Sequence, residues 1–342
     1  MTGAARDRGR TSARLMAGAV LLCAAVLGGC ATFMPQTEAL RQTRPAGLPE
    51  RTELARVPFF PQRDYQCGPA ALATALGSVD VAVTPDELVG QVYLPARKGS
   101  LQVEMLAAAR RYGRVSYQLA PRFDDLLREV AAGTPVIVLQ NYGAGPFDVW
   151  HYAVVAGYDY ERGEVVLRSG EKERLVMPFG VFEYLWRDAD YWAMIAVPPD
   201  RIPPTASESA YLTAIAALEK SGDAGAARTA YASFLARWPD NAVAALGLAN
   251  AQHAQGDLTQ AEATLRAAAQ RHPESVAVLN NLAQTLSDAG RNREALVWIE
   301  RAHALGGPLA AAVAETRGLI LRRAASGDAG PGAERTDRTG GG

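Results

Sequence analysis

Three motifs in the C-terminal part of the chain recur with a period of 34 residues. They are a glycine followed by a charged residue (Gly222-Asp223, Gly256-Asp257 and Gly290-Arg291), an alanine (Ala227, Ala261 and Ala295) and a proline (Pro239 and Pro273). A period of this length, with a small residue where two helices cross and a proline at the end of the unit, indicates pairs of stacked helices. Because one helix pair cannot bury its apolar face alone, the pattern predicts a solenoid with a concave surface.

This pattern resembles tetratricopeptide repeats, and the resemblance covers residues 208–324. The three units and a capping helix are expected at residues 208–241, 242–275, 276–309 and 310–323. An unrelated helical bundle is the alternative, although three markers at one period argue against it. The resemblance implies a protein partner on the concave surface, but the alternative that a short array only orients the first domain stays open. Residues 325–342 are rich in glycine and are expected to be disordered.

A different pattern precedes the repeats, and the two parts meet between residues 198 and 207, where four prolines interrupt all periodicity. Residues 51–199 first show helical spacing of apolar residues and then short apolar runs bounded by turns. Helices are expected at residues 68–76, 84–92, 100–112, 122–132 and 179–186, and strands at residues 135–140, 151–158, 164–169 and 191–197. Helices followed by an antiparallel sheet indicate an α+β domain, joined to the repeats by a linker at residues 200–207.

The first 29 residues have the features of an export signal. Four arginines within residues 6–14 precede an apolar run at residues 15–27, which has the length found in signal peptides and is short for a membrane span. The run ends in Leu27-Gly28-Gly29-Cys30, which resembles the lipobox of bacterial lipoproteins. An ordinary signal peptide, or a short anchor with an incidental cysteine, is the alternative.

The lipobox resemblance implies cleavage before Cys30 and a lipid on its new amino terminus. Residues 30–50 are polar, carry prolines and show no sustained period, so they are expected to tether the first domain to the membrane. Ala31 follows the lipid site, which resembles the pattern for outer-membrane sorting. The expected location is therefore the bacterial envelope, at the outer membrane and facing the periplasm.

Cys67 is expected to be the one free thiol, because the other two cysteines have other expected fates. Cys23 would leave with the signal peptide, and Cys30 would carry the lipid. An unpaired thiol in an exported protein is a liability unless its reactivity is used. Because residues 68–76 favour a helix with Pro69 in its first turn, Cys67 is expected at a helix amino terminus, where the partial positive charge favours the thiolate. A buried and inert cysteine is the alternative.

His151 is the histidine that the first domain offers as a base. The chain has four histidines, and the other three, His253, His272 and His303, lie in the repeats. His151 opens a predicted strand directly after a loop, from which its ring can project toward a helix amino terminus. A cysteine and a histidine from separate elements form the thiol-protease arrangement, in which the histidine takes the thiol proton and later gives it to the leaving group. A structural histidine at a strand start is the alternative.

The motifs around these residues resemble a known peptidase family. Gln62, Cys67-Gly68-Pro69-Ala70-Ala71 and His151-Tyr152-Ala153-Val154-Val155 are similar, in this order, to the glutamine, cysteine and histidine motifs of bacteriocin-processing cysteine peptidases. These are papain-like domains that cut after double-glycine leaders. The resemblance spans residues 51–199 and implies that Gln62 donates its amide to the oxyanion of the tetrahedral intermediate. Gln66 is the rival for that role, and no metal or organic cofactor is implied.

The chain departs from this family at the third member of the triad. Relatives usually carry an aspartate and a proline at the end of the strand after the histidine, where this chain has Arg168-Ser169-Gly170. Asp159 lies at the hairpin turn and, at about 3.3 Å per residue, would be roughly 25 Å from His151. Pairing across the hairpin instead returns Ser169 to His151. Ser169 is therefore the predicted orienting group, with Glu171 behind it.

Together these features predict an exported, lipid-anchored, papain-like cysteine peptidase domain of α+β class, followed by an all-α repeat solenoid. Its substrate would be a peptide bond in an envelope or exported protein that the repeats recruit. The net charge of -1 gives no reason to expect a nucleic-acid partner. No nucleotide-binding signature is present in the sequence, so ATP-driven export is not expected. The alternatives are a catalytically weak scaffold and an acyl transferase or amidase that acts on a non-protein substrate.

Overall fold

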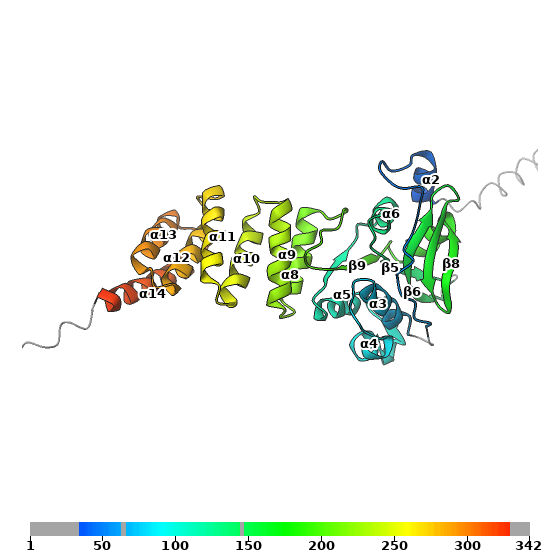
Figure 1. Ribbon diagram of the computed structural model, residues 1–342, viewed down its shortest axis with the longest axis horizontal. Helices are drawn as coiled ribbons and strands as arrows, with labels where there is room; N and C mark the ends of the chain where they lie inside the picture. Colours follow the sequence, from blue (N-terminus) through cyan, green and yellow to red (C-terminus); the bar gives the residue numbers. More distant parts are fainter. Residues whose placement is uncertain (1–33, 63–65, 144–146, 329–342) are drawn as a thin grey trace, which may run out of the picture.

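The computed structural model describes residues 34–62, 66–143 and 147–328. In this part of the chain a domain of helices and strands is followed by an elongated array of helix pairs (Figure 1). The expected signal peptide, the lipid site at Cys30 and most of the expected C-terminal tail lie outside the described residues. Within the described ranges, no helix is both long and apolar enough to cross a bilayer.

The first domain is built on an antiparallel sheet with the strand order β4-β9-β5-β6-β7-β8, in which β1 also pairs with β6. The strands are β1 (Arg51–Glu53), β4 (Val115–Gln118), β5 (Val136–Asn141), β6 (Trp150–Asp159), β7 (Glu164–Ser169), β8 (Lys172–Pro178) and β9 (Ala193–Val197). The four predicted strands are confirmed as β5, β6, β7 and β9. The other three were not predicted, because β1 and β4 are very short and most of β8 is exposed.

Helices cover both faces of this sheet, as Figure 1 shows. One face carries α3 (Cys67–Gly77), α4 (Pro85–Val92) and α5 (Gln102–Arg111), and the other carries α6 (Phe123–Ala131) and α7 (Phe179–Arg187). Alternate residues of β5 supply the two cores: Ile137 and Leu139 pack toward α3, whereas Val136 and Val138 pack toward α6. A small hairpin, β2 (Tyr93–Leu94) and β3 (Gly99–Ser100) around the turn η1 (Pro95–Arg97), connects α4 to α5.

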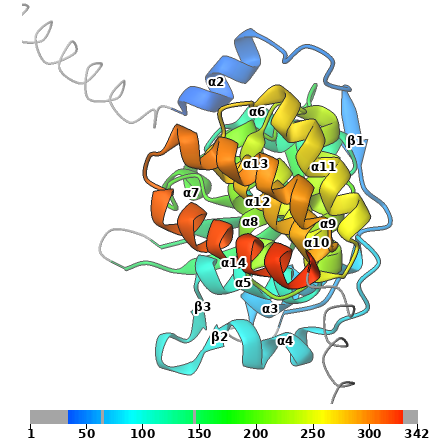
Figure 2. The same cartoon turned by 90° about the vertical axis from the view of Figure 1, so that its left-hand side faces the viewer.

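The segment that was expected to be a tether folds onto the first domain. Residues Pro35–Gln42 form helix α2, in which Thr37 and Leu40 are buried. The backbone N–H groups of Gln36 and Thr37 donate to the carboxylate of Glu183 in α7 at 2.9 and 2.6 Å. These contacts are tertiary, so a search for sequence period does not detect them. Figures 1 and 2 place α2 and α4 at opposite ends of the domain.

The second part of the chain consists of stacked helix pairs, as its period predicted. They are α8 (Glu208–Glu219), α9 (Ala224–Arg237), α10 (Ala242–Ala254), α11 (Leu258–Arg271), α12 (Val276–Asp288), α13 (Asn292–Leu305) and the final α14 (Ala310–Asp328). The repeated glycine turns the chain between the two helices of a pair: Gly222 has a φ of 95° and Gly256 a φ of 77°. The following Asp223 and Asp257 cap the second helix.

The two parts of the chain share one hydrophobic core. Tyr211 and Ile215 of α8 are fully buried in the same cluster as Val115 and Tyr117 of β4, so α8 covers a sheet edge that would otherwise be exposed. The linker is also fixed in place, because its Thr205 N–H donates to the buried carboxylate of Glu129 at 3.0 Å. The array is therefore a packed extension of the first domain and not a loosely attached module.

Candidate active site

Cys67 is the first residue of α3, and its thiol is free and partly buried. The neighbouring hairpin explains why glycine follows it. The phenol of Tyr152 in β6 donates to the backbone oxygen of Ser100 at 3.2 Å and so holds Ser100 against α3. A Cβ atom on Gly68 would lie 2.2 Å from Ser100 Oγ, which leaves no room for a side chain. The alanines that follow are buried and let α3 pack closely on the sheet.

The first residues of β6, which include His151, are paired with β5 but not with β7. The β6–β7 pairing runs from Val154 opposite Arg168 to Asp159 opposite Glu164, so the first residues of β6 extend beyond it. There the backbone of Tyr152 contacts Gln62 and Cys67 instead: its N–H is hydrogen-bonded to the Cys67 sulfur, and its carbonyl accepts from Gln62 Nε2 at 3.4 Å. The Gln62 N–H donates to the Gly170 carbonyl at 3.1 Å.

His151 lies on β6 immediately before Tyr152, and its ring is bonded to the predicted third residue. Its Nε2 atom is 2.9 Å from Ser169 Oγ at the end of β7. The hairpin argument from the sequence predicted this proximity. The other ring nitrogen, Nδ1, takes no part in this contact.

The remaining residues that the sequence suggested, Glu171, Asp159 and Gln66, make other contacts or are exposed. Glu171 is exposed in the turn between β7 and β8. Asp159 is the last residue of β6, at the other end of the strand from His151, and it accepts a hydrogen bond from the Arg162 N–H. Gln66 is the residue before α3, and its carbonyl accepts from the Ala70 N–H.

The sequence interpretation missed the residues behind the imidazole. The ring of Tyr142 meets that of His151 edge to face, with centroids 5.6 Å apart and an interplanar angle of 83°. The Tyr142 hydroxyl donates to Gln140 Oε1 at 3.3 Å and is also hydrogen-bonded to Ser169. Gln140 is a polar side chain that is fully buried in an apolar strand, and this was the one signal that sequence reasoning could have used.

The loop that joins Tyr142 to His151 is held at its base by one amide. Asn141 Oδ1 accepts from the N–H groups of Gly143 and Val149, both at 2.9 Å, and its Nδ2 donates to Asp148 at 2.8 Å. The Tyr142 N–H donates to the Val149 carbonyl at 2.9 Å. These bonds fix the backbone on both sides of the loop.

Burial disfavours the charged forms of both Cys67 and His151. Burial raises the pKa of the Cys67 thiol, and hydrogen bonds from the N–H groups of Tyr152, Gly68 and Cys67 offset only part of this effect. Burial lowers the pKa of His151. In the part of the chain that the structure describes, no group of histidine, cysteine and carboxylate side chains is arranged to hold a metal ion.

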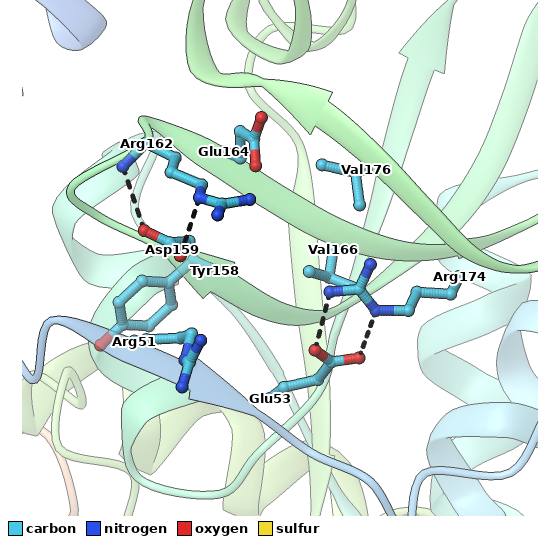
Figure 3. Close-up of a pocket in the computed structure, with 9 residues that line it drawn as sticks. All are labelled: Arg51, Glu53, Tyr158, Asp159, Arg162, Glu164, Val166, Arg174 and Val176. Atoms are coloured by element: carbon cyan, nitrogen blue, oxygen red, sulfur yellow. Dashed lines mark hydrogen bonds and ion pairs between the residues drawn. The ribbon is translucent and has the colours of Figure 1, made fainter.

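A separate cavity of about 310 Å³ lies at the other end of the β6–β7 hairpin (Figure 3). Its charged side chains are largely paired: Arg174 donates to the Glu53 carboxylate at 2.8 and 3.0 Å, and Arg162 lies 3.9 Å from Asp159. The lining residues include neither a nucleophilic thiol nor a histidine. The candidate site is therefore at the Cys67 end of the sheet.

A thiol at the start of a helix that packs on an antiparallel sheet, with a histidine on one of the sheet's strands, is the arrangement of the papain-like peptidases. Residues 54–188 match the Peptidase_C39 like family, and residues 218–269 and 253–306 match the tetratricopeptide repeat. The chain thus contains a C39-like peptidase domain followed by tetratricopeptide repeats, which confirms the two resemblances and the fold class predicted from the sequence.

Among solved structures, the chain is similar to a proposed C39-like peptidase from Bacillus anthracis. The two are 19% identical, with a TM-score of 0.37, over 44% of this chain and 98% of that one. No curated protein matches the chain.

Proposed function

We propose that the first domain is a cysteine peptidase that hydrolyses peptide bonds, with Cys67 as the nucleophile and His151 as the base and acid. The observation that carries this proposal is the position of the Cys67 sulfur against the N–H of Tyr152, the residue next to His151. The bond from His151 Nε2 to Ser169 supports it, because that bond directs Nδ1 away from Ser169 and leaves it for the thiol.

The reaction would begin when His151 Nδ1 takes the thiol proton as the sulfur attacks the peptide carbonyl carbon. Gln62 Nε2 carries two N–H donors, one of which is bonded to the Tyr152 carbonyl, so the second can donate to the oxyanion. Collapse breaks the C–N bond, and the amine leaves with the proton from His151. Water then hydrolyses the thioester, with His151 as the base, and restores the thiol.

The site of action is proposed from the sequence. We place the protein in the bacterial envelope, anchored by lipid at Cys30, with an envelope or exported protein as its substrate. The packed junction between α8 and β4 supports recruitment by the repeats, because a rigid array holds a bound partner in a constant orientation relative to the site.

A catalytically weak scaffold is the second candidate, and one observation favours it. The group that hydrogen-bonds to His151 is a hydroxyl and not a carboxylate, and burial disfavours charge on both Cys67 and His151. A peptidase domain of this kind could retain binding while it turns over slowly.

Labelling with an electrophilic thiol probe separates these candidates. If the domain is an enzyme, folded protein labels at Cys67, and His151→Ala slows that labelling at least tenfold. Cys67→Ala and His151→Ala should each abolish peptide hydrolysis, whereas the matched carboxylate variant Asp159→Asn should not. If Cys67 is not labelled, or if His151→Ala does not change its labelling rate, the result would support the proposal of a catalytically weak scaffold.

A further inference from the structure

The hydrogen bonds behind His151 form a continuous chain of three uncharged side chains. His151 Nε2 lies 2.9 Å from Ser169 Oγ, Ser169 is hydrogen-bonded to the Tyr142 hydroxyl, and that hydroxyl lies 3.3 Å from Gln140 Oε1. Gln140 and His151 are directly opposite one another in the β5–β6 ladder, so the chain begins and ends on paired residues.

Gln140 fixes the donor and the acceptor at the end of this hydrogen-bond chain that is farthest from His151. The side chain is fully buried, and its Nε2 atom lies 3.9 Å from the sulfur of Met177. A thioether sulfur accepts hydrogen bonds and cannot donate one, so the amide nitrogen faces Met177 and the carbonyl oxygen faces Tyr142. Gln140 is therefore an acceptor for the phenol.

The direction of the bond to Gln140 fixes the directions of the other hydrogen bonds, because each hydroxyl has a single proton to donate. Burial raises the pKa of Tyr142, so the phenol keeps its proton and donates it to Gln140. The phenol oxygen then accepts from the Ser169 hydroxyl, and the Ser169 oxygen accepts from His151 Nε2–H. The imidazole that results carries its proton on Nε2 and a lone pair on Nδ1, which is the form that can deprotonate a thiol.

We propose that Tyr142 and Gln140 are positioning residues that set the tautomer of His151 through Ser169, in the place where related peptidases use a carboxylate. The proposal rests on the proposed function, since it concerns the same base. A neutral chain can orient the ring and select the tautomer, but it does not stabilise the imidazolium with a charge. In the resting site His151 Nδ1 then has a free lone pair that can accept a proton, while the three uncharged side chains supply no charge that favours transfer of the Cys67 proton to it.

The position of Tyr142 suits this role. Tyr142 is 42% exposed, and the edge-to-face contact of its ring with that of His151 limits rotation of the imidazole. The backbone of Tyr142 is tied to Val149, two residues before His151, so the two rings share one rigid hairpin base.

The test uses the full chain with Tyr142→Phe, which removes the hydroxyl and keeps the ring. Without its acceptor, the Ser169 hydroxyl is free to donate to His151 Nε2, so the proton should shift toward Nδ1. Long-range proton–nitrogen NMR correlations report which ring nitrogen carries the proton, and a His151→Gln sample assigns the signals. We expect a roughly fivefold change in the tautomer ratio, as for the loss of one hydrogen bond.

Tyr160→Phe is the matched control. Tyr160 lies just past the other end of β6, and its hydroxyl donates to the Leu40 carbonyl, so this variant also loses one phenol hydrogen bond. It should leave the His151 signals unchanged. The same samples are treated with iodoacetamide, and the rate at Cys67 is read by mass spectrometry of its peptide.

The two readouts separate the inference from the proposed function. An Nε2-protonated ring in the wild type that shifts in Tyr142→Phe supports the positioning role. A wild-type ring protonated on Nδ1, or an unchanged tautomer in Tyr142→Phe, overturns it, whatever the reactivity of the thiol. If the ring is protonated on Nε2 but the iodoacetamide rate at Cys67 is the same in the wild type and in His151→Gln, the peptidase proposal is refuted. The inference about the hydrogen-bond chain is then unaffected.

Discussion

Ser169→Asp would place a carboxylate where His151 Nε2 now meets a hydroxyl oxygen at 2.9 Å. With charge centres about 4 Å apart and an effective dielectric constant near 20, the attraction to an imidazolium is about 4 kcal/mol. Ser169 is only 6% exposed, so burial of the new charge offsets part of this gain, although the Tyr142 hydroxyl can donate to it. A net gain of about 1.4 to 2.8 kcal/mol would shift the site tenfold to a hundredfold toward the thiolate–imidazolium pair.

The assay for this variant is the rate of iodoacetamide alkylation of Cys67 as a function of pH. In Ser169→Asp the pH dependence should move to lower pH, so the rate at neutral pH rises. Ser169→Asn has the same size without the charge and should stay close to the wild type. If the two variants react equally fast, the contact between Ser169 and His151 does not control charge at the thiol, and the reasoning fails.

Three further outcomes follow from the structure. Because burial raises the pKa of Cys67, its alkylation in the wild type should keep rising with pH beyond about 8.5, the ordinary value for a thiol; a plateau below neutral pH would contradict this. Gly68→Ala should destabilise the protein by about 1–3 kcal/mol in urea denaturation, because its Cβ would lie 2.2 Å from Ser100 Oγ, and Ser100→Gly should restore most of the loss. Ile215→Ala should cost about 2–5 kcal/mol and lower the stability of both domains in one transition, whereas two independent transitions would argue against a shared core.

Most of the regular architecture could be read from local pattern. The helix after Cys67 and the strands that carry His151 and Ser169 were visible because long apolar runs were bounded by turn residues. The repeats were clearer still, since a 34-residue period reflects contacts between neighbours in sequence. Short or exposed elements such as β4 and β8 carry too few buried residues to leave a pattern.

Helix α2 shows why residues 30–50 were interpreted as a tether. A helix of eight residues is marginal by itself. It is stabilised by Glu183, which accepts from its first N–H groups and lies 146 residues away from Thr37 in the sequence. No local signal encodes such a partner.

The sequence by itself singled out Cys67 and His151 as the candidate nucleophile and base, because the first domain offers one free cysteine and one histidine. It also predicted that the hairpin brings Ser169 to His151, and the structure has this contact. Only the tertiary structure showed that Ser169 is hydrogen-bonded to Tyr142, and Tyr142 to Gln140. The physical reason is that a hydrogen-bond chain depends on which side chains meet across strands and on the orientation of one buried amide. These are properties of packing, and a single sequence does not display them.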